Sequence, residues 1–362
     1  MNMTILRAAL FACFALLSAS AQAQFTFVTN NGTITITGYT GPGGNVTIPS
    51  ATNGLPVTDI GSDAFGGNDS VSSVTIPDSV TSIEAYAFSD CTSLTNVTIP
   101  DSVTNIREFA FLSCSLATMT IPNSVTNLGD MAFGNCTNLT SVTISSSVTY
   151  IGDQVFAGCT KLTNVTIPDS VTSIEDGAFA YCTSLSNVTI PAGVTSIGYV
   201  AFYGCTSLKG ATIPNGVVYI GSYAFYNCTN LTKALFQGNA PSVNGGAGSA
   251  DTTAFYGDSG TVYYLPGTTG WTNTFGGWPT APWSQPNPQI LGNGYGLGVS
   301  SNQFGFTVSW ATNVSVVVEA CTNLANPVWT RVATNALSNG VCAFTDPQWT
   351  NYPSRFYRVR SQ

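Results

Sequence analysis

The chain has 362 residues, of which only 9 are Lys or Arg and 17 are Asp or Glu, and none is His. Without His there is no Ser-His-Asp or Cys-His catalytic set and no His-zinc site, so most familiar enzyme classes are excluded. A hydrophobic fraction of 44% excludes disorder by composition. The formal net charge of −8 disfavours nucleic acid as a partner, because phosphate recognition depends on Lys and Arg.

The N-terminus predicts an exported protein. Arg7 precedes an apolar run at residues 8–17, and Ala21-Gln22-Ala23 supplies the small residues that a signal peptidase recognises. We therefore expect a signal peptide at residues 1–23. The run of roughly ten apolar residues is too short to cross a membrane, which needs about 20, and we expect no membrane span elsewhere.

Residues 24–45 predict an N-terminal cap. Two alternating runs, at 25–28 and 33–37, are joined by Asn31-Gly32, a pair that favours a tight turn between antiparallel strands. We expect this β-hairpin to cover the first unit of the repeat array that follows.

A 23-residue repeat fills residues 46–238. Its marker is a phenylalanine that recurs every 23 residues, with one spacing of 22 where a residue is missing after Cys114. A fixed period in this range indicates stacked units, each of which cannot bury its apolar side alone. The marker residues are Phe65, Phe88, Phe111, Phe133, Phe156, Phe179, Phe202 and Phe225.

The sequence of each unit predicts one short strand, followed by a return segment that leads the chain back to the start of the next strand. The spacing Leu94-x-x-Val97-x-Ile99 is typical of a strand, and Pro100 ends its hydrogen-bond ladder. Apolar positions three and four residues apart, from residue 103 to Phe111, predict a return through 3₁₀ or short helical turns.

This unit resembles the BspA-like leucine-rich repeat, with Cys, Leu, Val, Ile, Pro, Val, Ile, Ala and Phe at fixed offsets from Cys91 to Phe111. The resemblance implies a mainly β leucine-rich-repeat solenoid of short parallel strands. Proteins of this class act at bacterial and protozoal surfaces in adhesion and in binding host or matrix proteins. The resemblance therefore implies a binding protein and does not name its ligand.

Residues 239–285 predict an irregular last repeat and a C-terminal cap. Ala254-Phe255 echoes the repeat 30 residues after Phe225, and residues 261–266 resemble a last strand with its proline. Trp271, Trp278 and Trp283 are expected to cover the final coil, and an alternative is that their rings stack on sugars.

Residues 286–298, rich in Pro and Gly, predict a linker to a separate module at 299–362. Short alternating runs at 304–310, 314–319, 328–332, 341–344 and 356–360 predict a small antiparallel β-sandwich. The segment resembles the fibronectin-III-like module that ends many exported proteins of Verrucomicrobia-type bacteria.

The cysteines predict no metal centre. Seven recur once per coil, at 91, 114, 136, 159, 182, 205 and 228, so their Cβ vectors are parallel and neither a disulfide nor a tetrahedral metal site follows. We expect buried free thiols that pack as small apolar groups. Cys321 and Cys342 fall on neighbouring predicted strands of an exported module and are the candidate disulfide.

Each strand carries outward polar residues between its inward Val and Ile, which predicts a flat, uncharged face of hydroxyl and amide groups. Thr favours strands for structural reasons alone, so a scaffold role and a partner-docking role both stay open. The candidate binding residues on this face are Thr75, Asn96, Thr98, Thr120, Thr143, Asn164, Thr166, Asn187, Thr189 and Thr212.

Charge is unevenly divided. Residues 46–283 hold 15 acidic and 4 basic side chains, a balance of −11, whereas the tail from residue 284 holds 2 acidic and 4 basic, a balance of +2. The sequence predicts a non-catalytic, exported or cell-surface protein that binds an extracellular or surface protein through the repeats, with no cofactor. The alternatives are carbohydrate binding by the Trp-rich cap and a structural spacer of the cell envelope.

Overall fold

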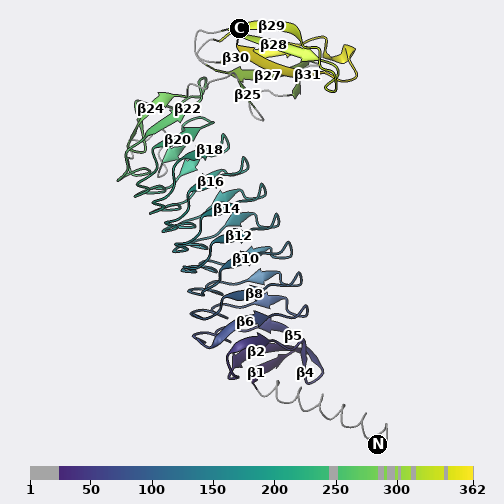
Figure 1. The fold of residues 1–362 in the computed structure, drawn as a ribbon, viewed down its shortest axis with the longest axis vertical. Helices are drawn as coiled ribbons and strands as arrows, with labels where there is room; N and C mark the ends of the chain where they lie inside the picture. The colour runs from purple at the N-terminus through teal and green to yellow at the C-terminus, as the bar shows by residue number, and fades with distance from the viewer. Residues whose placement is uncertain are drawn as a thin grey trace, which may run out of the picture.

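The computed structural model describes residues 24–243, 252–283, 289–291, 298–300, 303–310, 315–337 and 341–361. They form a rod of stacked coils with a smaller β-module at its C-terminal end (Figure 1). The predicted parallel-strand solenoid and the predicted C-terminal antiparallel sheets are both confirmed. The predicted signal peptide lies outside the described residues.

One strand from each coil joins a parallel array along the rod, which we call the threonine sheet. In β8 the central Val97 is buried and both flanking side chains are exposed, as the predicted alternation requires. The strands are β3 (Gly44–Thr47), β6 (Val71–Thr75), β8 (Asn96–Thr98), β10 (Thr118–Thr120), β12 (Ser141–Thr143), β14 (Asn164–Thr166), β16 (Asn187–Thr189), β18 (Ala211–Ile213), β20 (Lys233–Phe236), β22 (Thr261–Tyr264) and β24 (Trp278–Pro282).

A second parallel array, which we call the rear sheet, was not predicted. Each coil adds about two residues to it, such as Asn105–Ile106, and the Ile is fully buried. Its strands fall into two separate sheets: β5 (Leu55–Ile60), β7 (Ser82–Ile83), β9 (Asn105–Ile106) and β11 (Asn127–Leu128) belong to the first, and β13 (Tyr150–Ile151), β15 (Ser173–Ile174), β17 (Ser196–Ile197), β19 (Tyr219–Ile220) and β21 (Ser242–Val243) form the second.

The third side of each coil, the turn side, replaces the predicted helical return. Around Phe88 the amides of Tyr86, Phe88 and Asp90 donate to carbonyls of the next coil at 2.7–3.2 Å, whereas those of residues 87, 89 and 91 bond within the coil. Tyr86 and Asp90 have φ of 59° and 58°, in the left-handed region, which ends any helix after one turn. The prediction of helical returns was wrong, and the only helix among the described residues is η1 (Trp349–Asn351).

The core is a stack of phenylalanine rings that runs the length of the rod. Consecutive rings from Phe65 to Phe225, and then Phe255, have centroids 4.8–5.9 Å apart. All are essentially fully buried. Phe255 therefore continues the ladder despite the longer spacing that precedes it in the sequence.

Aromatic side chains also close both ends of this stack. Tyr39 stacks on Phe65 at 5.3 Å, and Trp278 stacks on Phe255 at 4.5 Å. Tyr39 comes from the predicted N-terminal hairpin, β1 (Phe25–Asn30) and β2 (Thr33–Tyr39), whose second strand pairs with β5. Two further short strands, β4 (Ala51–Thr52) and β23 (Thr274–Phe275), pair antiparallel with β5 and β24.

The C-terminal module consists of two small antiparallel sheets. A core of apolar side chains that includes Phe306, Val308, Val316 and Phe344 lies between them. One sheet holds β25 (Gln289–Ile290), β26 (Gly298–Ser300), β27 (Gln303–Ser309) and β30 (Val341–Asp346), and the other holds β28 (Ser315–Cys321), β29 (Thr330–Ala336) and β31 (Phe356–Ser361).

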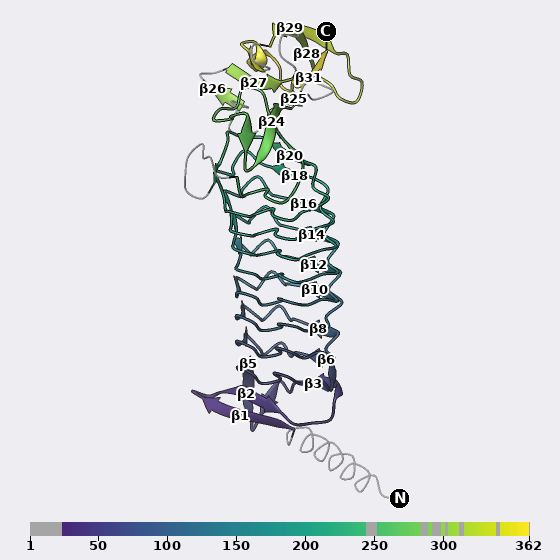
Figure 2. The same ribbon diagram turned by 90° about the vertical axis from the view of Figure 1, so that its left-hand side faces the viewer.

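The predicted linker overlaps this module. Residues 289–290 and 298 belong to strands β25 and β26, and the rest of the predicted linker, apart from Leu291, lies outside the described residues. The module sits on the C-terminal end of the rod in both views (Figure 2). Gly267 of the cap, with φ of 89°, lies so close to Val341 of β30 that an added Cβ would come within 2.7 Å of it.

Loss of one ring from the middle of the stack should destabilise the rod. Phe156 lies between Phe133 and Phe179, at 5.9 and 5.6 Å. We expect Phe156→Ala to lower the free energy of unfolding by about 3–5 kcal/mol, measured by urea denaturation with far-UV circular dichroism. Tyr150→Ala, which removes an exposed ring, is the control and should cost about 1 kcal/mol or less. Equal costs would contradict the structural role of the ladder.

Asp258 makes stability depend on pH. One of its oxygens accepts the Cys228 amide at 2.9 Å, the other is buried without a partner among the described residues, and burial raises its pKa from 3.8 to about 6. Because the folded pKa is the higher one, the folded state binds the proton more tightly. The carboxyl therefore favours folding most below about pH 4, and this contribution is lost as pH rises through 6.

We expect Asp258→Asn to flatten the fall in melting temperature between about pH 4 and pH 6, because Asn keeps an acceptor and does not titrate. Asp101→Asn, at an exposed carboxyl elsewhere in the repeats, should keep the wild-type slope. The measurement is thermal unfolding followed by circular dichroism across this pH range. An unchanged slope in Asp258→Asn would contradict the assignment.

Candidate functional site

The structure places all ten predicted binding residues on exposed positions of the threonine sheet. Strand pairing aligns Thr120, Thr143 and Thr166 in one row, and aligns Thr75 with Thr98 in the same way. The full set, all exposed, is Thr75, Asn96, Thr98, Thr120, Thr143, Asn164, Thr166, Asn187, Thr189 and Thr212.

The outward threonines differ from the threonines that serve the scaffold. Elsewhere hydroxyls link coils, as where Thr140 and Thr163 donate to carbonyls of the preceding coil at 3.0 and 3.4 Å. Among the described residues, the hydroxyls of the outward row have no such bond. They are therefore available to water or to a partner.

The threonine sheet is interrupted at the 22-residue unit. Strand β8 pairs with β6 and strand β10 with β12, but the two groups are separate sheets. A hollow of about 500 Å³ lies at this break, and Ser145, which replaces the proline of other units, borders it with a buried hydroxyl that has no partner among the described residues. The hollow is lined by polar side chains that include Asn96, Thr98, Asp101, Thr118, Thr120 and Asn123.

The tryptophans of the cap are packed as a lid. Trp278 is only 2% exposed, and Trp271 stacks on Tyr264 at 5.1 Å while its indole N–H donates to Thr268 at 2.8 Å. Trp283 is half-buried. Because the ring faces of Trp271 and Trp278 already pack against the protein, the geometry does not support sugar stacking by this cluster.

The seven repeat cysteines are buried free thiols, as predicted. Each also donates its S–H to a phenylalanine carbonyl on the preceding coil, as where Cys182 donates to Phe156 at 3.2 Å. Within the described ranges, no group of His, Cys, Asp or Glu is arranged to hold a metal ion. In the same part of the chain, no helix has the length and apolar character to cross a membrane.

The predicted disulfide between Cys321 and Cys342 is not formed. Both thiols are free, and their strands belong to different sheets, because β28 pairs with β29 and β31 whereas β30 pairs with β27. The prediction was wrong because it placed the two strands side by side, and the order of strands in a sandwich does not follow their order in the chain.

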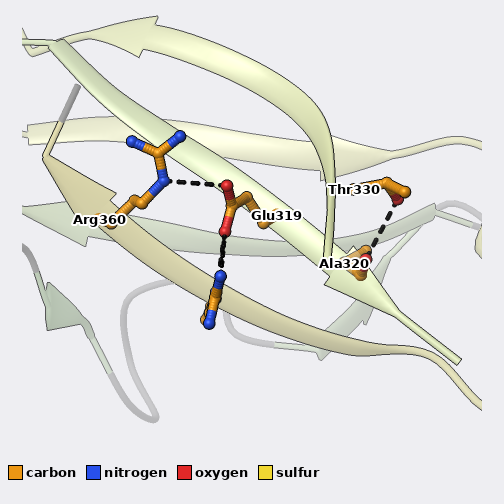
Figure 3. Close-up of polar contacts among 5 residues, drawn as sticks. Glu319, Ala320, Thr330 and Arg360 are labelled. Carbon is orange, nitrogen blue, oxygen red and sulfur yellow. Dashed lines mark hydrogen bonds and ion pairs between the residues drawn. The ribbon is translucent and has the colours of Figure 1, made fainter. Parts of the chain in front are cut away.

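Three of the four basic residues of the C-terminal module are held in ion pairs within it. Glu319 accepts from Arg360 at 2.9 Å and from Arg358 at 2.8 Å (Figure 3), and these charges lower the pKa of its carboxyl. Arg355 pairs with Asp346 at 3.1 Å. These three arginines therefore stabilise the module by pairing with its two carboxylates.

Six tyrosines gather on the turn side of the last four coils, and we call them the tyrosine cluster. Their rings form one connected set, with Tyr181 on Tyr203 at 4.8 Å, Tyr203 on Tyr226 at 5.0 Å and Tyr226 on Tyr256 at 5.6 Å. Tyr199 and Tyr223 join through further edge contacts. The exposed fractions of Tyr181, Tyr199 and Tyr256 are 53%, 48% and 57%.

These tyrosines were not among the predicted binding residues, because they occupy positions that vary between units. A signal was present: the position after the marker phenylalanine is Gly, Ser, Leu, Gly, Ala and Ala in the first six units and then Tyr in the last three. These substitutions by Tyr gather on the turn side of the rod near its C-terminal end, which indicates a surface that is specific to that end.

A ladder of carboxylates runs along the turn side toward the tyrosine cluster. Asp130, Asp153 and Asp176 occupy the same position of successive coils, all exposed, and each accepts the amide of the following coil at 2.7–3.2 Å. The last of these amides belongs to Tyr199. The acidic ladder and the cluster are therefore continuous.

Comparison with known proteins identifies the repeats. Residues 58–183 and 149–249 match the family described as BspA type leucine rich repeat region, with six copies. This chain belongs to the BspA-type leucine-rich repeat family. No protein of curated function matches the sequence.

Solved structures similar to this BspA-type chain are bacterial. A leucine-rich repeat protein from Bacteroides ovatus is 29% identical, with a TM-score of 0.52, over 67% of this chain and 70% of that one. A T. pallidum leucine rich repeat protein is 34% identical, with a TM-score of 0.49, over 51% of this chain and 88% of that one. The first similarity supports the solenoid fold of this chain.

The repeat thiols should be unreactive in the folded protein. Burial raises the pKa of Cys136 to about 12 and raises those of Cys159, Cys182 and Cys205 well above the ordinary value. We expect iodoacetamide at about pH 8 to leave these thiols unmodified until the chain is unfolded in guanidinium, because the thiolate is the reactive form. Half-buried Cys342 is the internal control and should label first.

The measurement is peptide mass spectrometry over time. Labelling of Cys159 or Cys182 at equal rates in the folded and unfolded protein would contradict the buried ladder.

Proposed function

We propose that this chain is a non-catalytic, exported or cell-surface binding protein that presents its threonine sheet to a partner protein. The observation that carries the proposal is the aligned row of exposed threonine and asparagine side chains, whose threonine hydroxyls have no partner within the described residues. A rigid face of this kind can dock a second protein without first ordering a loop, which lowers the entropic cost of association.

Family membership supports a binding role, since the repeat builds an extended surface and stacked repeats use such surfaces to contact partners. Export is supported by the N-terminal sequence, in which a basic residue, an apolar run and Ala21-Gln22-Ala23 follow one another. The absence of catalysis is proposed because the chain has no His, because most acidic side chains of the repeats are exposed, and because the two buried carboxylates of the C-terminal module, Glu319 and Asp346, are paired with arginines.

The hollow at the break between β8 and β10 is the place on this face where specific contacts are expected. Elsewhere on the sheet the strands pair continuously, whereas the break here leaves a hollow in which Asp101 and Asn123 lie beside the flanking threonines. A partner residue that enters the hollow would fix the position of the partner along the rod.

The test is capture of surface and extracellular proteins by the immobilised chain lacking residues 1–23, followed by affinity measurement with the partner recovered. We expect Thr98→Lys with Thr166→Lys to weaken binding at least about tenfold, because the bulky charges stand in the row. The control, Thr126→Lys with Thr149→Lys, adds the same charge beside the rear sheet, where both side chains are exposed, and should change affinity less than about twofold.

Equal loss in the two double variants would show that the threonine sheet is not the docking face. Capture of polysaccharide alone would favour the carbohydrate-binding alternative, and capture of neither would contradict the proposed binding role.

A further inference from the structure

The tyrosine cluster has no role in closing the core. Phenylalanine rings in coils without these tyrosines, such as Phe133 and Phe156, are as fully buried as those beneath the cluster, and the C-terminal end of the stack is covered by Trp278. Six neighbouring tyrosines, three of them about half exposed, are a large amount of aromatic surface for the side of a soluble rod. Contiguous exposed aromatic surface marks interaction sites, and Tyr is enriched at them.

The rings offer faces and hydroxyls together over the last four coils. Tyr181, Tyr203 and Tyr226 form a continuous line of ring contacts, which holds each ring in place before a partner arrives. Ordered tyrosines lose little further conformational entropy on binding, which makes them effective contact residues.

Charge decides what kind of partner fits. The adjoining ladder of Asp130, Asp153 and Asp176 is acidic, and Asp258 lies at the other end beside Gly257. Across the turn segments 129–137, 152–160, 175–183, 198–206, 221–229 and 252–258, all within the described ranges, there is no Lys or Arg. Arg107, one coil before Asp130, pairs with Glu84 at 3.7 Å, and Lys161, just beyond one of these segments, donates to Asn138 at 2.7 Å. The ladder from Asp130 to Asp176 therefore has no basic side chain within these segments.

The carboxylates of the ladder also oppose one another. Burial, and next the charge of Asp130, raise the pKa of Asp153. A cation brought alongside would relieve that repulsion, and the exposed tyrosine faces beside it would stabilise the same cation through cation–π contact. The C-terminal module shows that contact within this chain, where the guanidinium of Arg355 lies 4.2 Å from the ring centroid of Tyr352.

We propose that the tyrosine cluster and the adjoining carboxylates form a second docking surface, on the turn side of the rod, for a Lys- or Arg-rich segment of a partner protein. The basic groups lie over the rings and pair with Asp153 and Asp176, and their alkyl stems pack against the exposed tyrosine edges. This surface is separate from the threonine sheet and adds to the proposed function.

The test uses a fluorescein-labelled octa-arginine peptide as the probe, with octa-glutamate as the matched negative, and measures binding to the full chain by fluorescence anisotropy at about 0.15 M salt. We expect the arginine peptide to bind and the glutamate peptide not to bind. Failure of the wild-type protein to bind the arginine peptide overturns the proposal.

Two pairs of variants localise the binding. Tyr181→Ser, Tyr199→Ser and Tyr256→Ser together should weaken it at least about tenfold, whereas Tyr86→Ser with Tyr150→Ser, at exposed tyrosines outside the cluster, should change it less than about twofold.

The second pair separates local from net charge. Asp153→Asn with Asp176→Asn should weaken binding about tenfold, and Asp78→Asn with Asp169→Asn, which removes the same charge at exposed positions elsewhere, should change it less than about threefold. Asn keeps a side-chain oxygen that can accept the backbone N–H of the following coil. Circular dichroism confirms that each variant folds. Equal losses within either pair overturn the proposal, because binding would then follow net charge or total tyrosine content.

Loss of binding to a neutral oligosaccharide in the triple tyrosine variant, with arginine-peptide binding unchanged, would assign the cluster to a glycan and also overturn the proposal. A partner captured on the threonine sheet whose affinity is unaffected by the triple variant leaves the proposed function intact. The two hypotheses therefore fail independently.

Discussion

No coil of this solenoid can bury its own phenylalanine ring, and covering that ring requires another aromatic ring about 5 Å above and below it, which is a phenylalanine within the rod and Tyr39 or Trp278 at its ends. This requirement fixes where each coil returns, since a ring can meet its neighbour only if the chain comes back to the same place after one circuit. The 22-residue spacing before Phe133 and the 30-residue spacing before Phe255 keep this return, because both rings still stack on their neighbours. The requirement also fixes the groups around the ring. The Cys182 thiol donates to the carbonyl of Phe156, and the Phe179 amide donates to the carbonyl of Ala201.

The same requirement separates the inside of the rod from the outside. Inward positions such as Val97, Ile106 and Phe111 are nearly constant from coil to coil, because each must match the coil on either side. Outward positions carry no such constraint. The threonine sheet has stayed nearly uniform, whereas the turn side changes from Gly and Ala to Tyr within a few coils. Uniformity on one side and change on another indicate surfaces with different uses.

Much of this architecture was predictable because it repeats. The strand at 96–98, the buried thiols and the outward threonines follow from fixed offsets alone. The rear sheet was missed because two residues per coil, such as Asn105–Ile106, are too few to show an alternation. The turn side of each coil was predicted to be helical because successive tight turns give the same three- and four-residue spacing of apolar side chains as a helix. Left-handed backbone at non-glycine residues such as Tyr86 leaves no mark in the sequence.

Repetition also creates a problem that the irregular positions resolve. On a perfectly periodic face, a partner shifted by one coil would make the same contacts, so the uniform row from Thr120 to Thr212 provides affinity without a defined position along the rod. The break between β8 and β10, with its hollow, and the tyrosine cluster on the last four coils each occur at one height only. A partner that contacts either of them is held in one register. Specificity in this rod therefore resides where the repeat departs from its period.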